Sequence, residues 1–125
     1  RARYEVPVEQ YNKTITIEAN LMVLMANRYI LPAAYRFQSE LAQAVTSVKA
    51  AGSTSKEAKR TLDSVCRLTD ECKLRVDALQ EAVEHEAQGD PERHAKYFRD
   101  KVVPAMAALR EAGDSLECIR AADRL

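Results

Sequence analysis

The feature that most constrains this fold is a pair of long apolar rows whose members are spaced alternately by three and four residues. The first row consists of Leu62, Val65, Thr69, Cys72, Val76, Leu79 and Val83. The second consists of Phe98, Val102, Ala105, Leu109, Ala112, Leu116 and Ile119. This spacing brings all members of a row to one face of an α-helix and is the heptad pattern of packed helices. The rows therefore predict two long amphipathic helices.

Two glycines mark where helices are expected to end. Gly52 follows a long periodic run, and Thr54 and Glu57 then have the spacing of a capping box, in which both side chains bind free backbone amides. In Gly89-Asp90-Pro91, the glycine suits the left-handed residue that ends a helix. The aspartate then suits the N-cap of the next helix, and the proline suits its first turn. These turns predict three helices, at Val8–Ala51, Thr54–Gln88 and Pro91–Ala122.

The three helices are expected to form one all-α, antiparallel bundle over residues 1–125. Short turns make neighbouring helices antiparallel, and the apolar rows then meet at a constant register. The row expected on the first helix consists of Met22, Ala26, Tyr29, Ala33, Phe37, Leu41, Ala44 and Val48. Residues Thr14–Glu18 alternate like a strand, but a lone short strand has no partner in this chain, which favours helix there too.

Pro32 and Pro104 interrupt the first and third helices. Proline inside a helix removes a backbone donor, and its ring clashes with the carbonyl four residues earlier, here that of Arg28 or Asp100. We therefore expect both helices to be kinked, with those two carbonyls unpaired. Counting through the second helix places the two prolines about one helical turn apart, so that the bundle bends at one level.

The start of the first helix is expected to extend past the second helix. Residues before about Glu18 have no counterpart in the second helix, which has already ended near Gly89. Apolar side chains in this overhang need another surface. Tyr11, Ile15 and Ile17 are therefore predicted to form a docking surface, through which the fragment would also tend to self-associate.

Composition indicates neither a nucleic-acid partner nor a membrane. The 19 basic residues equal the 19 acidic ones, so no net field attracts nucleic acid or an anionic membrane. No apolar run approaches the roughly 20 residues of a membrane-spanning helix. Cys66, Cys72 and Cys118 lack CxxC spacing, which favours reduced thiols and a cytoplasmic location.

No catalytic, cofactor-binding or metal-binding residues are predicted. Di-metal bundles use Glu-x-x-His on two helices, and this pattern is absent. The segment that starts at His85 fails the HExxH pattern because Gly89 stands where the second histidine would be. His85 and His94 are expected to be solvated turn residues, Cys72 a small core residue, and Cys66 and Cys118 free thiols at the edges of the apolar rows.

Two segments resemble a known family. Tyr11–Ala33, which contains Lys13-Thr14-Ile15, Ile17-Glu18-Ala19 and Ile30-Leu31-Pro32-Ala33, is similar to the C-terminal helical region of type III glutamine synthetases. Tyr97–Glu117, with Arg99-Asp100 and Pro104-Ala105-Met106, is similar to the same region. The resemblance implies a parent ligase of nitrogen metabolism that forms glutamine from glutamate and ammonia with ATP and magnesium, as a large ring-based oligomer.

Three hypotheses about function follow. The favoured one is a non-catalytic C-terminal domain of such a ligase, because the family's ATP, glutamate and metal sites lie in an upstream catalytic domain and the chain begins without methionine. Its expected partners are that catalytic domain and neighbouring subunits. The second hypothesis is a self-contained coiled-coil interaction module, and the third is a bundle that binds a small molecule.

Overall fold

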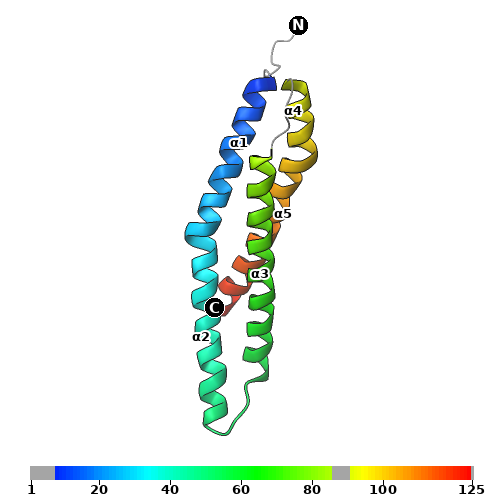
Figure 1. Cartoon of the computed structure of the whole chain (residues 1–125). Coiled ribbons are helices and arrows are strands. Elements are labelled where there is room, and N and C mark those ends of the chain that lie inside the picture. The colour runs from blue at the N-terminus through cyan, green and yellow to red at the C-terminus, as the bar shows by residue number, and fades with distance from the viewer. Residues whose placement is uncertain (1–7, 86–90, 125) are drawn as a thin grey trace.

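The computed structural model describes residues 8–85 and 91–124, and within these ranges the chain is helical apart from the turn that joins two helices near Gly52 and from His85, which follows the end of a helix. Its helical segments are α1 (Val8–Met25), η1 (Ala26–Ile30), α2 (Leu31–Ala50), α3 (Lys56–Glu84), α4 (Pro91–Tyr97), η2 (Phe98–Val102) and α5 (Val103–Arg124). They stack end to end into three rods, α1–η1–α2, α3 and α4–η2–α5 (Figure 1). The predicted all-α bundle of three long helices is confirmed.

The middle rod, α3, runs antiparallel to the two outer rods, which are parallel to each other (Figure 1). The outer rods pack closely on α3, mainly through α2 and α5, and α1 also lies against α4. At one end of the bundle α1 and α4 extend past the last turn of α3, and at the other end α2 and α3 extend past α5 (Figure 1). Each end of the bundle is therefore a pair of helices.

The core follows the rows predicted for the second and third helices. The buried hydrophobic residues are Ala19, Ala26, Leu31, Ala34, Phe37, Val65, Cys72, Val76, Leu79, Phe98, Val102, Met106, Leu109, Ala112 and Leu116. Thr69 is buried as well, and its hydroxyl donates a hydrogen bond to the Val65 carbonyl at 2.7 Å, which satisfies the polar group inside the helix. The row predicted for the first helix is wrong in part, because Tyr29 and Ala44 are exposed.

The reason is a wider helical turn in the first rod. Residues Ala26–Ile30 form a π-helical turn in which the Leu31 amide donates to the Ala26 carbonyl, five residues earlier. Such a turn holds one residue more than an α-helical turn, so it shifts the apolar face by one position. The buried face consequently passes from Ala26 to Leu31 and not through Tyr29.

Both prolines directly follow such a turn. Pro32 is the second residue of α2, after η1, and Pro104 is the second residue of α5, after η2, in which the Val103 amide donates to the Phe98 carbonyl. A wider turn gives the proline ring room where an α-helical carbonyl would clash with it. The structure therefore accommodates both prolines by the same device, while the predicted kinks and unpaired carbonyls stay predictions.

The two prolines do not lie at one level, so that part of the prediction is wrong. The Ile30 side chain lies 3.6 Å from the position that a Cβ atom on Gly113 would occupy, which brings the start of α2 beside the middle of α5. Pro32 is then about eleven residues, or roughly 16 Å at the α-helical rise, further along the bundle than Pro104. Counting residues through α3 predicts the register of each outer rod against α3. Errors in the two registers add, so the position of one outer rod along the other is predicted poorly.

The turn between α2 and α3 ends α2 with Gly52 as predicted, but α3 does not begin with the predicted capping box. Gly52 has a φ of 86°, and the Ser53 amide donates to the Val48 carbonyl at 3.1 Å, as in a Schellman motif. The predicted capping box is wrong, because the N-cap of α3 is Ser55, whose side chain makes no capping hydrogen bond. The Glu57 carboxylate instead pairs with Arg60 at 3.0 Å.

Replacing Gly52 with alanine is expected to lower the free energy of unfolding by about 1 kcal/mol, because a Cβ atom disfavours positive φ. The space around Gly52 is open, so the cost comes from the backbone conformation and not from a clash. Urea denaturation followed by circular dichroism measures the change. Alanine at Gly113, which lies inside α5, is the control and should not destabilise the fold, since helix propensity favours alanine there.

Candidate functional site

The residues predicted to dock lie at the α1–α4 end of the bundle but do not share one face. Tyr11 is 37% exposed and Ile17 is 61% exposed, whereas Ile15 is half-buried and packs against the core. The predicted overhang exists relative to α3 alone, because α4 lies beside α1 and covers its inner side. Sequence counting missed this cover, since it placed the third helix too far along the first. Docking through Tyr11 and Ile17 stays a prediction.

A longer apolar surface follows the outer side of the first rod. It consists of Ile17, Leu21, Leu24, Met25 and Tyr29, and we call it the α1 stripe. These side chains are between 44% and 62% exposed, although all five are large hydrophobic or aromatic residues. The spacings of four, three, one and four residues place them along one side of a helix. Contiguous exposed apolar surface of this kind marks interaction sites in soluble proteins.

Charges flank the α1 stripe but do not interrupt it. Glu18 lies near its start and Arg28 near its end, and the nine residues between them carry no charge. Both flanking side chains are exposed. Other exposed faces differ, because α3 carries ion pairs four residues apart such as Lys59–Asp63 and Lys73–Asp77, both at 3.1 Å. The outer side of α1 is therefore not built as an ordinary solvated face.

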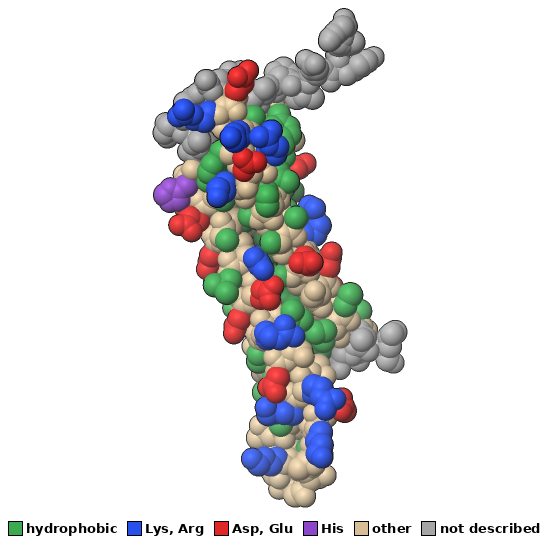
Figure 2. Space-filling model, turned by 90° about the vertical axis from the view of Figure 1, so that its right-hand side faces the viewer, with side chains coloured by type: hydrophobic (Ala, Val, Ile, Leu, Met, Phe, Trp, Pro, Cys, Tyr) green, Lys and Arg blue, Asp and Glu red, His purple; other side chains and the backbone are tan. Residues whose placement is uncertain are grey.

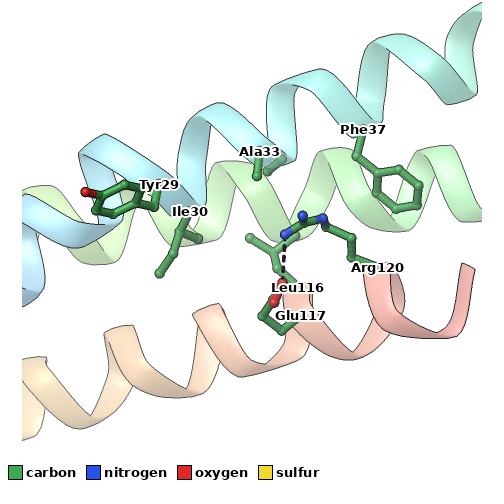
Figure 3. A pocket seen from close by; sticks show the side chains of 8 residues that line it. Tyr29, Ile30, Ala33, Phe37, Leu116, Glu117 and Arg120 are labelled. Carbon is green, nitrogen blue, oxygen red and sulfur yellow. Dashed lines mark hydrogen bonds and ion pairs between the residues drawn. The ribbon is translucent and has the colours of Figure 1, made fainter. Parts of the chain in front are cut away.

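A small hollow lies between the start of α2 and the end of α5, as Figure 3 shows. It has a volume of about 190 Å³, and its lining is mostly apolar, with Ile30, Ala33 and Phe37 on one side and Leu116 on the other. Arg120 and Glu117, which lie at its edge, form an ion pair with each other at 3.0 Å. These two charges are thus paired within α5, and Tyr29 also lines the hollow.

A basic cluster occupies the turn end of the α2–α3 pair. Lys49, Lys56, Lys59 and Arg60 are among the residues that line a hollow of about 430 Å³. Figure 2 shows Lys and Arg side chains gathered at the lower end of the molecule. Two of these cations are already paired, Lys59 with Asp63 and Arg60 with Glu57. What remains is a weak positive patch on exposed, flexible side chains, which does not define a ligand.

Within residues 8–85 and 91–124, no three His, Cys, Asp or Glu side chains gather where they could hold a metal ion. His85 is exposed as predicted, but His94 is half-buried on α4, and its Nε2 atom has no hydrogen-bond partner among the described residues. Among those residues, no helix is both long and apolar enough to cross a membrane.

The three thiols should differ sharply in reactivity. Cys72 is buried, Cys66 is half-buried and Cys118 is exposed, and burial raises the pKa of the Cys72 thiol. We expect a thiol reagent to modify Cys118 first, then Cys66, and Cys72 only after unfolding. Timed labelling with mass spectrometry measures the order, and early labelling of Cys72 in the folded chain would contradict the packing of α3.

The same raised pKa sets a pH dependence. Below the ordinary pKa of a thiol, Cys72 is protonated in both the folded and the unfolded chain, so it makes no contribution that varies with pH. As the pH rises through that value, the unfolded chain loses the proton more readily than the folded chain, and stability falls. A Cys72→Ala variant, compared with the unmodified chain over alkaline pH, should lack this part of the decline.

Comparison with known proteins connects the first rod to one family. The family model described as "Glutamine synthetase C-terminal domain" matches residues 1–49, which include α1, η1 and all of α2 except its last residue. A type-3 glutamine synthetase from Dictyostelium discoideum is 26% identical over 125 residues, covering 94% of this chain. The chain spans only 17% of the length of that relative. No solved structure matches the chain. The resemblance to the C-terminal region of type III glutamine synthetases is therefore confirmed.

Proposed function

We propose that this chain is an accessory helical domain of a type III glutamine synthetase-like ligase, which packs on the parent's catalytic domain or on neighbouring subunits and has no catalytic activity alone. One observation carries the proposal: the α1 stripe lies within the residues that match the C-terminal domain model. An apolar helix face that the bundle leaves exposed fits a domain that packs against more protein.

The chemistry of the proposed parent is the formation of glutamine from glutamate and ammonia with ATP and magnesium. Among the described residues no three His, Cys, Asp or Glu side chains gather to hold a metal ion, and the hollow between α2 and α5 has a mostly apolar lining and a volume of only about 190 Å³. We therefore assign ATP, glutamate and magnesium to the part of the parent outside this chain. The role that we propose for these residues is packing against other parts of the parent protein.

Two measurements test the proposal. Isothermal titration calorimetry of the isolated chain with ATP and magnesium should give no saturable heat, and saturable binding at micromolar concentration would contradict the non-catalytic assignment. The second measurement uses the whole parent polypeptide. There Leu21→Asp should impair subunit assembly and glutamine formation, because it puts a charge on the α1 stripe.

Leu74→Asp is the matched control for the whole-parent experiment. Leu74 is 68% exposed on α3, so the same substitution there changes the charge by the same amount on a different face. Equal effects of the two substitutions would contradict a role specific to the stripe. A start codon directly before Arg1 in the gene would instead favour the second hypothesis, a self-contained coiled-coil interaction module.

A further inference from the structure

We infer that the α1 stripe binds the same stripe of a second copy of this chain, with the two α1 helices antiparallel. The inference rests on the proposed function, which assigns the α1 stripe to packing. It goes further because it names the surface against which the stripe packs. Two features argue for a second copy as the occupant, namely the placement of the flanking charges and the area of the stripe.

The flanking charges make the stripe complementary to itself. Glu18 and Arg28 lie five residues on either side of Val23. In an antiparallel pair centred on Val23, Glu18 of each copy is level with Arg28 of the other, and opposite charges meet at both ends. A parallel pair would instead bring Glu18 level with Glu18 and Arg28 level with Arg28. Charge complementarity of this kind selects orientation and register.

The apolar residues match in the same register. Ile17 of one copy becomes level with Tyr29 of the other, and Leu21 becomes level with Met25, so each large side chain faces another and none faces a charge. Leu24 lies close to the two-fold axis and packs near its own counterpart. An interface in which one patch meets itself has two-fold symmetry, which is the commonest symmetry of protein oligomers.

The area of the stripe fits a weak, concentration-dependent dimer. Five large side chains that are about half exposed present on the order of 500 Å² per copy, so pairing removes roughly 1,000 Å² in total. That value lies at the lower limit for specific interfaces. We therefore expect isolated chains to exchange between monomer and dimer at micromolar concentration, and a parent assembly to add further contacts.

Sedimentation velocity of the isolated chain, over a hundredfold range of concentration, tests the inference through charge reversal. Glu18→Arg alone and Arg28→Glu alone should each weaken dimerisation about tenfold or more, because like charges then meet at both ends of the pair. The double variant Glu18→Arg/Arg28→Glu should regain the dimer. An equimolar mixture of the two single variants should also dimerise, since one variant carries arginine at both flanking positions and the other carries glutamate at both.

Several outcomes would overturn the inference. A chain that stays monomeric throughout the range excludes the second copy as occupant, while the proposed packing on the parent's catalytic domain would still be tested by the whole-parent experiment. A dimer that Leu21→Asp leaves intact, or that Leu74→Asp disrupts equally, lies elsewhere on the molecule. A dimer that the double charge reversal does not restore is not the antiparallel pair described.

Discussion

Replacing Phe98 with alanine is expected to lower the free energy of unfolding by about 3–5 kcal/mol. Phe98 is 1% exposed and is among the largest of the fully buried side chains. Its ring meets the Tyr97 ring edge to face, with centroids 6.2 Å apart, and the Tyr97 hydroxyl donates to the Ala82 carbonyl on α3 at 2.6 Å. Truncation therefore opens a cavity where η2 joins the other rods, and it removes the aromatic pair.

Tyr35→Ala provides the control for this substitution. Tyr35 is half-exposed on α2, so its removal should change stability by less than about 1 kcal/mol. Because domains of this size are stable by only about 5–15 kcal/mol, the Phe98→Ala variant should show a large fall in its urea midpoint. Equal losses for the two variants would mean that η2 is not anchored in the core as the structure shows.

The fold was largely predictable because the apolar rows and the turn residues indicate the same helices. The spacing from Leu62 to Val83 and from Phe98 to Ile119 identifies two helix faces, and Gly52 supplies the left-handed residue that ends α2. These signals are local and come from backbone geometry and burial. Helix ends were predicted less well, as Ser55 shows, because several residues in a polar turn can take the N-cap position.

The candidate site was less predictable because it depends on the phase and level of the first rod. A heptad applied without interruption puts Tyr29 in the core, whereas the π-helical turn puts it on the surface with Leu21 and Met25. The sequence did contain a signal, since the apolar spacing leaves the heptad phase beside Pro32. Ile15 was predicted to belong to a docking surface, but it packs against the core. Its burial depends on how far α4 lies along α1, and no local sequence pattern encodes that position.

The second large effect on stability is expected when the π-helical turn before Pro32 is removed by a deletion. Removing Arg28, an exposed residue of η1, should turn the five-residue π turn into an α-helical turn and keep the apolar faces of α1 and α2 in phase. Pro32 would then stand inside a regular α-helix, where its ring meets the carbonyl four residues earlier. We expect the deletion to cost about 3 kcal/mol.

Removing the proline separates this clash from other effects of the deletion. In the chain that lacks Arg28, Pro32→Ala should restore most of the lost stability, whereas in the full-length chain the same substitution should have little effect, because η1 already accommodates the ring. Deleting Arg36 is the control, since it lies in regular α-helix and its loss rotates Phe37 and the rest of α2 away from the core. That loss should be larger, and Pro32→Ala should not relieve it. Urea denaturation of the five variants and the unmodified chain measures the coupling, and additive effects of deletion and substitution would show that η1 does not serve to accommodate Pro32.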